Sequence, residues 1–222
     1  KKKKKGAAAG VCGIFQFQRG ETPGSRDRAL RGALGDATLR DASKPVLIPC
    51  YDLATGGPLL FSSSGASAAV EAGGYDFRMA DVCAATLGGG EVRSADGGTA
   101  VAAAEGAVAA GNPAAAAITH VLNNRVEFPS VAGVEDLLVV SLGNGEPERA
   151  GGGGRRGRPA AESPSDLVRI AVEGASDMVD QAVSMAFGDQ TATNYIRIQA
   201  NVRDPGEFQS SSDPGELLAM AE

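Results

Sequence analysis

The sequence predicts an α/β fold, because short apolar runs typical of strands alternate with longer segments of helical periodicity. The aliphatic run Val46–Ile48 is typical of a buried strand in a parallel sheet, and the apolar run at 137–142 is typical of another. Between and after them, the segments 113–124 and 166–188 repeat apolar residues at helical spacing. We therefore expect a mainly parallel central sheet with helices packed against it.

Composition narrows the class of protein. The 222 residues are 43% hydrophobic, which suits one domain or a piece of a larger one. The net charge is −6, and the five lysines at the start leave a more acidic remainder, so binding to nucleic acid through the general field is not expected. No apolar run is long enough to span a membrane.

The cysteines argue against a disulfide framework or a metal site. Cys12, Cys50 and Cys83 form no C-x-x-C pair, and their number is odd. We expect reduced, mostly buried thiols, as in a cytosolic-type compartment.

The first 34 residues are basic and rich in glycine, and they show no sustained periodicity, so we expect them to be irregular. The run Lys1–Lys5 precedes an apolar patch that Gln16, Gln18 and Arg19 soon interrupt, which disfavours a signal peptide. We expect a solvated tail, with weak attraction to an anionic membrane as the alternative.

Turn residues set the predicted elements of the first half. Gly56–Pro58 reads as a turn that joins the strand at 46–48 to a second strand at 59–61. A short helix starts at Met79 and ends in glycines. Residues 91–102 predict a hairpin around Asp96-Gly97, because Asp-Gly suits a turn with positive φ at both central positions.

In the second half, Asn112 is the predicted N-cap of a helix with Pro113 at its first position. The stretch at about 146–164 has the composition of a flexible linker. Ser163 or Ser165 then caps the helix 166–188, and a half-buried strand follows in which Ile196 and Ile198 alternate with Tyr195 and Arg197; a last helix starts at Glu216. The apolar stripe of the helix 166–188 comprises Leu167, Ile170, Ala171, Met178, Val179, Ala182, Met185 and Ala186.

Several segments resemble, in order, the plant patatin-like lipid acyl hydrolases. The resemblance runs from about Gly35 to Glu222 and covers the C-terminal half of the family domain. It implies a three-layer α/β sandwich that is incomplete here, preceded by the irregular segment 1–34. It also implies hydrolysis of acyl esters of phospholipids and galactolipids, without a cofactor. The matching segments are KPVLIPCYDLATGGPLLFS, YDFRMADVCAAT, GNPAAAAITHVLNN, GVEDLLVVSLGNG and LVRIAVEGASDMVDQAVSMAFG.

Members of this family use a Ser-Asp dyad. The serine lies in a G-x-S-x-G elbow, a D-G-G-G-x-R-G loop supplies the oxyanion hole, and the aspartate lies in D-G-G shortly before an N-N-P helix start. Counting back from Asn112, the resemblance places that aspartate on Glu105 and the two glycines on Gly106 and Ala107. This sequence therefore reads E-G-A, and it looks closest to a plant subgroup with glycine in place of the serine.

The catalytic parts that the resemblance calls for are not all present. No G-x-S-x-G occurs in the chain, since Ser67 and Ser176 each lack the last glycine. Glu105 is one methylene longer than aspartate, and a misplacement of about 1 Å can cost about a hundredfold in rate. Ala107 is also expected to crowd a tight turn that glycine would fit. We expect little or no turnover from this chain.

Four other motifs have simpler structural readings. Asp96-Gly97-Gly98 is a literal D-G-G, but strand-like stretches flank it, so we expect a hairpin turn. Residues 152–157 match G-G-G-x-R-G, yet they follow a polar stretch and read as linker. His120, the only histidine, lies within a helix, and Cys50 and Cys83 lie beside apolar residues as core thiols.

Three interpretations remain open at this stage. The first is an inactive relative of the acyl hydrolases, cytoplasmic or peripheral at membranes, with phospholipids or galactolipids as substrate or ligand. The second is a non-catalytic lipid-binding or protein-interaction module on the same scaffold. The third is a truncated product whose strand edges, at 46–48 and 137–142, lack covering neighbours.

Overall fold

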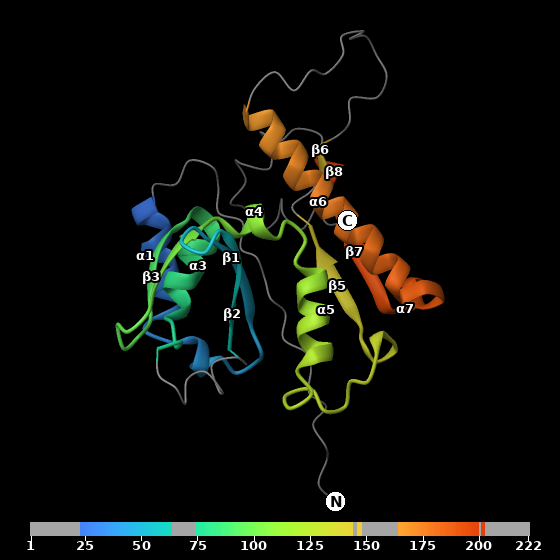
Figure 1. Cartoon of the computed structure of the whole chain (residues 1–222), viewed down its shortest axis with the longest axis horizontal. Helices are drawn as coiled ribbons and strands as arrows, with labels where there is room; N and C mark the ends of the chain where they lie inside the picture. The colour runs from blue at the N-terminus through green and yellow to red at the C-terminus, as the bar shows by residue number, and fades with distance from the viewer. Residues whose placement is uncertain (1–22, 64–73, 144–145, 148–163, 200, 203–222) are drawn as a thin grey trace, which may run out of the picture. The chain divides into compact units, whose positions relative to one another are not determined.

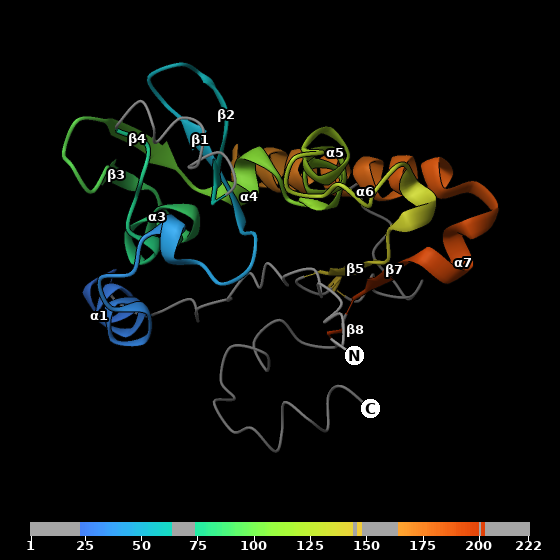
Figure 2. The ribbon, with the colours of Figure 1, turned by 90° about the horizontal axis from the view of Figure 1, so that it is seen from below.

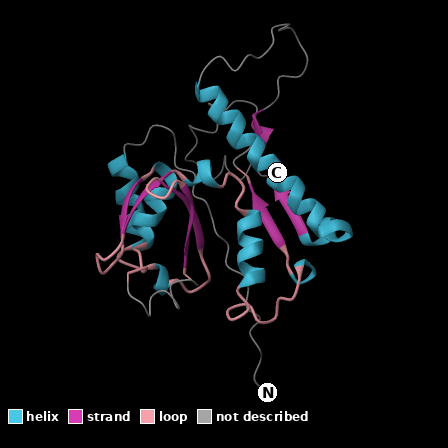
Figure 3. Ribbon diagram, viewed as in Figure 1, coloured by secondary structure: helices cyan, strands magenta, loops and turns pink. Residues whose placement is uncertain are grey.

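The computed structural model describes residues 23–63, 74–143, 146–147, 164–199 and 201–202 (Figure 1). It has a mixed α/β architecture, with helices and strands drawn in cyan and magenta in Figure 3. The described chain divides into two compact units, one ending at Ala110 and the other starting at Gly111. The predicted α/β class is confirmed.

A four-stranded antiparallel sheet forms the first unit. Its strands lie in the order β2-β1-β4-β3, so β1 and β4 are the inner strands. β1 pairs antiparallel with both neighbours, Cys50 lying opposite Leu59 and Tyr51 opposite Ala104. The strands are β1 (Leu47–Asp52), β2 (Gly57–Ser62), β3 (Gly90–Arg93) and β4 (Ala100–Ala104).

The prediction that the apolar run at 46–48 belongs to a parallel sheet is wrong. Of the run, Ile48 is buried and Val46 and Leu47 are partly buried, and burial continues through Pro49 and Cys50. An apolar run predicts that a strand is buried, however, and does not predict whether its neighbours run parallel or antiparallel to it. A short turn at residues 53–56 returns the chain as β2, and so short a connection can join only antiparallel strands.

The hairpin around Asp96 is confirmed, but its turn differs from the predicted type. Within this turn only Gly97 has a positive φ, of 73°, and Asp96 does not. The Asp96 carboxylate instead accepts hydrogen bonds from the Ser94 hydroxyl at 2.6 Å and from the Gly98 N–H at 2.9 Å. These two bonds close the turn between β3 and β4.

Two helices lie beside this sheet. α3 (Met79–Gly88) matches the predicted helix and ends at Gly89, whose φ of 72° suits glycine. α1 (Pro23–Leu34) contradicts the prediction that the first 34 residues are irregular, at least from residue 23 onward. Arg31 forms an ion pair with Asp81 of α3 at 2.8 Å, and Arg26 donates to the Leu87 carbonyl at 2.9 Å, so contacts with α3 stabilise a helix of weak periodicity.

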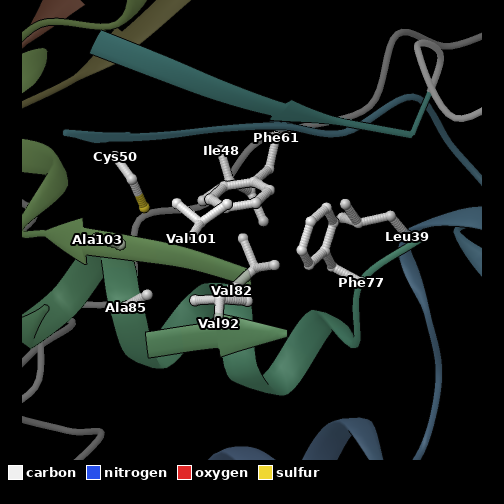
Figure 4. Close-up of a cluster of buried hydrophobic side chains, with 10 residues drawn as sticks. All are labelled: Leu39, Ile48, Cys50, Phe61, Phe77, Val82, Ala85, Val92, Val101 and Ala103. Carbon is white, nitrogen blue, oxygen red and sulfur yellow. The ribbon is translucent and has the colours of Figure 1, made fainter. Parts of the chain in front are cut away.

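The core of the first unit lies between α3 and one face of the sheet (Figure 4). Phe61 and Phe77 meet edge to face, with ring centroids 5.0 Å apart. A short 3-10 helix, η1 (Leu39–Asp41), contributes Leu39. The buried members are Leu39, Ile48, Cys50, Phe61, Phe77, Val82, Ala85, Val92, Val101 and Ala103.

Two pairs of parallel strands belong to the second unit. β5 (Val139–Leu142) pairs with β7 (Tyr195–Ile198), and β6 (Glu146–Pro147) pairs with β8 (Asn201–Val202). Among the described strands, the predicted parallel pairing therefore holds in this unit alone. The other elements are α5 (Ala114–Asn123), η2 (Val134–Asp136), α6 (Pro164–Phe187), η3 (Gly188–Gln190) and α7 (Thr191–Asn194).

Some predicted bounds change in this unit, among them the start of α6, which lies at Pro164 rather than 166. β5 begins at Val139 rather than 137. The preceding 3-10 helix η2 ends at Asp136, whose carboxylate accepts the Ala132 N–H at 2.8 Å, and residues 137 and 138 belong to neither element. The predicted linker at 146–164 begins with the two residues of β6, and its residues 148–163 lie outside the described chain. The helix expected from Glu216 also lies outside the described chain. α6 closes at Gly188, as predicted.

Helices α5 and α6 lie on one side of β5 and β7, as Figure 2 shows. On α5 the inward face includes Ala114, Ile118 and Leu122, as the periodicity indicates, but on α6 the inward face differs from the predicted stripe. On α6, Val183 and Phe187 are buried, whereas Met178 and Met185 of the predicted stripe are 68% and 76% exposed. Phe187 stacks on Tyr195 of β7 with ring centroids 5.8 Å apart, and Val179 is the stripe residue that packs against the same cluster.

Candidate functional site

Glu105 directly follows the inner strand β4. It caps the short helix α4 (Gly106–Ala109), with φ −49° and ψ 131°. Its side chain is exposed and has no hydrogen-bond or ion-pair partner among the described residues. The carboxylate is thus exposed and directly follows the last residue of the antiparallel strand β4.

Gly106 fixes the backbone next to this carboxylate. It is buried, and a Cβ built on it would lie 2.2 Å from the carbonyl oxygen of Pro49 and 2.2 Å from Oγ1 of Thr86. The Thr86 hydroxyl donates a hydrogen bond of 2.6 Å to the same Pro49 carbonyl. Glycine is therefore the residue that lets α4 lie against β1 and α3.

Ala107 does not carry the strain that the sequence predicted. It lies inside α4, half-buried, and no non-glycine residue of the described chain has a positive φ. The second residue after Glu105 is helical here, and alanine is a good helix former, so the expectation of a crowded turn is wrong.

Asn112 belongs to the second unit and is 3% exposed. Its Oδ1 accepts the Ala114 N–H at 3.1 Å, which is the bond expected of a capping side chain, although α5 begins one residue later than predicted, at Ala114. Its Nδ2 has no hydrogen-bond partner in the described chain. A buried amide donor left without a partner is costly, which makes this side chain notable.

A polar cluster between α6 and the inner faces of β5 and β7 escaped the sequence analysis. The Tyr195 hydroxyl donates to the Asp180 carboxylate, whose Oδ1 lies 4.0 Å from Nε of Arg197. Arg197 also donates to Ser141 Oγ at 2.7 Å and to Ser176 Oγ at 3.3 Å. Burial raises the pKa of Tyr195, and Asp180 raises it further. The alternation of Tyr195 and Arg197 on one face of β7 was the signal available.

Comparison with known proteins decides the family. The chain is 55% identical to Patatin-like protein 3 of Oryza sativa over 177 residues, 77% of this chain and 41% of that protein. It is 46% identical to Patatin-like protein 6 of Arabidopsis thaliana over 202 residues, 84% of this chain and 38% of that protein. This chain belongs to the plant patatin-like family. The predicted resemblance is confirmed.

A third patatin-like relative is a probable inactive member by its name. The chain is 42% identical to Probable inactive patatin-like protein 9 of Arabidopsis thaliana over 201 residues, 85% of this chain and 51% of that protein. The chain thus spans between about two fifths and one half of the length of these relatives. No protein-family model matches it.

The other side chains of this patatin-like chain that could have served as nucleophile or base have structural surroundings where the structure describes them. Ser176 lies within α6 and not in the strand–turn–helix setting of a nucleophile elbow. The His120 ring lies in α5, edge-on to Phe128 with centroids 6.4 Å apart. Burial raises the pKa of Cys50 to about 11, so its thiol is protonated near neutral pH. Ser67 and residues 152–157 lie outside the described chain.

Neither metal ligands nor a membrane span stand out in the described part of this patatin-like chain. Its His, Cys, Asp and Glu side chains form no group of three or more that could hold a metal ion. None of its described helices combines the length and apolarity needed to cross a bilayer.

Proposed function

We propose that this chain carries the carboxylate residue of a patatin-like acyl hydrolase site, with Glu105 at the aspartate position. We further propose that the chain alone has little or no turnover. The reaction implied by the family resemblance is hydrolysis of carboxylic esters in phospholipids and galactolipids, without a cofactor. In the family that the chain resembles, a serine elbow and an oxyanion loop complete the site, and the 222 residues contain neither G-x-S-x-G nor D-G-G-G-x-R-G. The setting is the cytoplasm, with peripheral contact at membranes.

The placement of Glu105 is the observation that supports this proposal. A general base must reach the proton it abstracts, so its carboxylate has to be exposed and uncommitted. Glu105 meets both conditions among the described residues, and its backbone is held by the close approach of Gly106 to Pro49. The matches to patatin-like proteins supply the family context.

The chemistry explains why turnover is not expected. A serine hydroxyl is a weak nucleophile until a base removes its proton, and the carboxylate of a dyad does so directly. Each oxyanion-hole donor contributes about 2.7–4 kcal/mol to the transition state. With neither a G-x-S-x-G elbow nor a family-type oxyanion loop before it, Glu105 has no nucleophile to activate.

A lipid hydrolysis assay tests the proposal. The purified chain is incubated with phosphatidylcholine vesicles, with monogalactosyl diacylglycerol and with a soluble p-nitrophenyl acyl ester. We expect fatty-acid release no faster than from the Glu105→Ala variant. Release well above that control would overturn the claim of inactivity and leave Glu105 as a working base.

Exposed aliphatic side chains favour a second candidate, a non-catalytic module that binds lipid. Met178 and Met185 of α6 project from its outer side, and Ile196 of β7 is half exposed. Co-sedimentation with vesicles of phosphatidylcholine or galactolipid discriminates the candidates. Binding without hydrolysis favours the module, and no binding to either vesicle removes it.

A further inference from the structure

The side of α6 that faces away from β7 carries its own apolar stripe. Val183 and Phe187 are buried against Tyr195 of β7, and Ser176 turns the same way, because Arg197 donates to its hydroxyl. The residues half a turn away point to solvent. We call the following six exposed residues the outer stripe: Leu167, Ala171, Gly174, Met178, Ala182 and Met185.

The outer stripe has the spacing of a contact between two helices. Its members follow one another after three or four residues, which keeps them on one face of α6 over about 27 Å. Its three large side chains, Leu167, Met178 and Met185, are 58%, 68% and 76% exposed. Apolar residues repeated in this way, with no charge among them, are the positions through which one helix packs on another.

Gly174, in the middle of the outer stripe, is not explained by contacts within the chain. A Cβ built on it would meet no atom of the described chain within 4 Å, and its φ is not positive. Alanine would therefore fit, and it would favour the helix, because glycine is a poor helix former. A residue without a side chain does allow a neighbouring molecule to approach closely. Gly174 thus indicates a partner outside the chain.

The outer stripe is symmetric about Ser176. Leu167 and Met185 lie nine residues before and after it, and Gly174 and Met178 lie two residues before and after it. Two copies of α6 that lie antiparallel about this point therefore bring each Met178 against the partner's Gly174. They also bring Leu167 against the partner's Met185. A parallel pair would instead place glycine against glycine and leave a gap, and it would align the two helix dipoles unfavourably.

We propose that α6 docks a second copy of this chain through the outer stripe, with the two helices antiparallel about Ser176. Such an isologous contact needs one surface that complements itself, and the exchange of Met178 for Gly174 across the symmetry axis provides it. The contact is only one helix wide, which is small for a protein interface, so the dimer is weak and reversible. Glu173 and Asp177 are exposed beside the stripe and disfavour an anionic lipid surface as the occupant.

Sedimentation equilibrium of the 222-residue chain, over a range of protein concentrations and without lipid, tests the docking. The test variant Gly174→Leu puts a side chain where the partner's Met178 lies. The control is Gly32→Leu, the same change at an exposed glycine of α1 where a Cβ also meets no atom within 4 Å. Circular dichroism checks that both variants fold, and Gly174→Ala replaces Gly174→Leu if that variant does not.

A compensating variant tests the antiparallel register. Gly174→Leu combined with Met178→Ala exchanges the large and the small residue on the same helix. The introduced leucine then meets the partner's introduced alanine only if the helices are antiparallel about Ser176. Both positions are exposed in the single chain, so its folding should change little.

We expect a reversible dimer from the unchanged chain and from Gly32→Leu. The dissociation constant of Gly174→Leu should be about tenfold higher or more, because overpacking a fitted contact is costly. The combination with Met178→Ala should recover most of that loss. Because self-association is measured without lipid, the outcome of the hydrolysis assay leaves this result unaffected.

Four results would overturn the inference. The unchanged chain could stay monomeric at every concentration, or Gly174→Leu could dimerise as tightly as Gly32→Leu. The combination with Met178→Ala could fail to recover the dimer, which would exclude the antiparallel register. Finally, Gly174→Leu could bind phosphatidylcholine vesicles more tightly than an unchanged, monomeric chain does, and lipid would then be the occupant, because leucine adds apolar surface.

Discussion

Gly106 lies against the carbonyl oxygen of Pro49 so closely that a Cβ on the glycine would sit 2.2 Å from that oxygen. Real Cβ atoms do not approach backbone oxygen at this distance, so α4 and β1 can meet only while this residue has no side chain. Glu105 precedes Gly106 directly. The packing of one glycine therefore sets where the candidate acid lies.

Replacing Gly106 by alanine is expected to destabilise the first unit by about 1–3 kcal/mol, the usual cost of overpacking against atoms that cannot move. Urea unfolding at neutral pH measures this. Gly32→Ala is the matched control, because a Cβ on Gly32, within α1, meets no atom within 4 Å. A Gly106→Ala midpoint equal to that control would mean that the close approach to Pro49 does not exist.

Removing the Tyr195 hydroxyl is expected to destabilise the second unit. Tyr195→Phe loses the hydrogen bond to Asp180. We expect the free energy of unfolding to fall by about 1 kcal/mol. This is a low value for a charged acceptor, because a third of the Asp180 side chain is exposed to solvent. The pKa of Tyr195 is raised above its ordinary value of 10.0, chiefly by burial. Above pH 10 the unfolded tyrosine ionises first, which favours unfolding.

The advantage of the unchanged protein over Tyr195→Phe should therefore be full below pH 10 and shrink as the pH rises through the folded-state pKa. Urea midpoints of both proteins between pH 7 and pH 11 show this difference. A gap that stays constant or widens at alkaline pH would contradict the buried, neutral phenol.

Asp96 should stabilise its hairpin in the ionised form. The Ser94 hydroxyl, and then the Gly98 N–H, hold the pKa of Asp96 below its ordinary value of 3.8. The contribution is present above pH 3.8 and is lost as the pH falls through the lower, folded-state pKa. Asp96→Ala should thus melt earlier at pH 7, with the difference closing in acid. A difference independent of pH would refute the carboxylate's role.

Cys50 should resist alkylation in the folded protein. It is fully buried, and burial raises its pKa to about 11, so both access and thiolate are lacking at pH 8. Iodoacetamide treatment followed by peptide mapping should find Cys50 unmodified without denaturant and modified with it. Alkylation of Cys50 under native conditions would show that the core between β1 and α3 opens readily.

Local signals predicted the short elements well. The glycines after residue 87 end α3, and Asp96-Gly97 lies between β3 and β4, as expected. Asn112 bonds the first turn of α5 through its side chain. In each case a few neighbouring residues determine the geometry, so the sequence carries the whole signal.

Long-range pairing could not be read in the same way. The run at Val46–Ile48 indicated burial but not direction, and the antiparallel sheet follows from the turn after Asp52. In β7, alternation identified two faces, but Tyr195 and Arg197 face α6 because Asp180 and Ser141 supply polar partners there.

For the candidate site, the resemblance assigned Glu105 to the family's aspartate position, but it gave no reason for Gly106 and a wrong expectation of strain for Ala107. The reason for Gly106 is the tertiary contact with Pro49 and Thr86, which come from two other elements. The cluster around Tyr195 likewise joins residues far apart in the chain. Such contacts are not encoded by local spacing.

The central claim is that Glu105 stands at the acid position of a patatin-like site and that this chain provides no serine for it to activate. A fluorophosphonate tests this most directly, because it phosphonylates activated serines with loss of fluoride. We predict that the intact mass of the folded chain does not change. A single adduct on a serine, formed by the unchanged chain and absent from Glu105→Ala, would contradict the account.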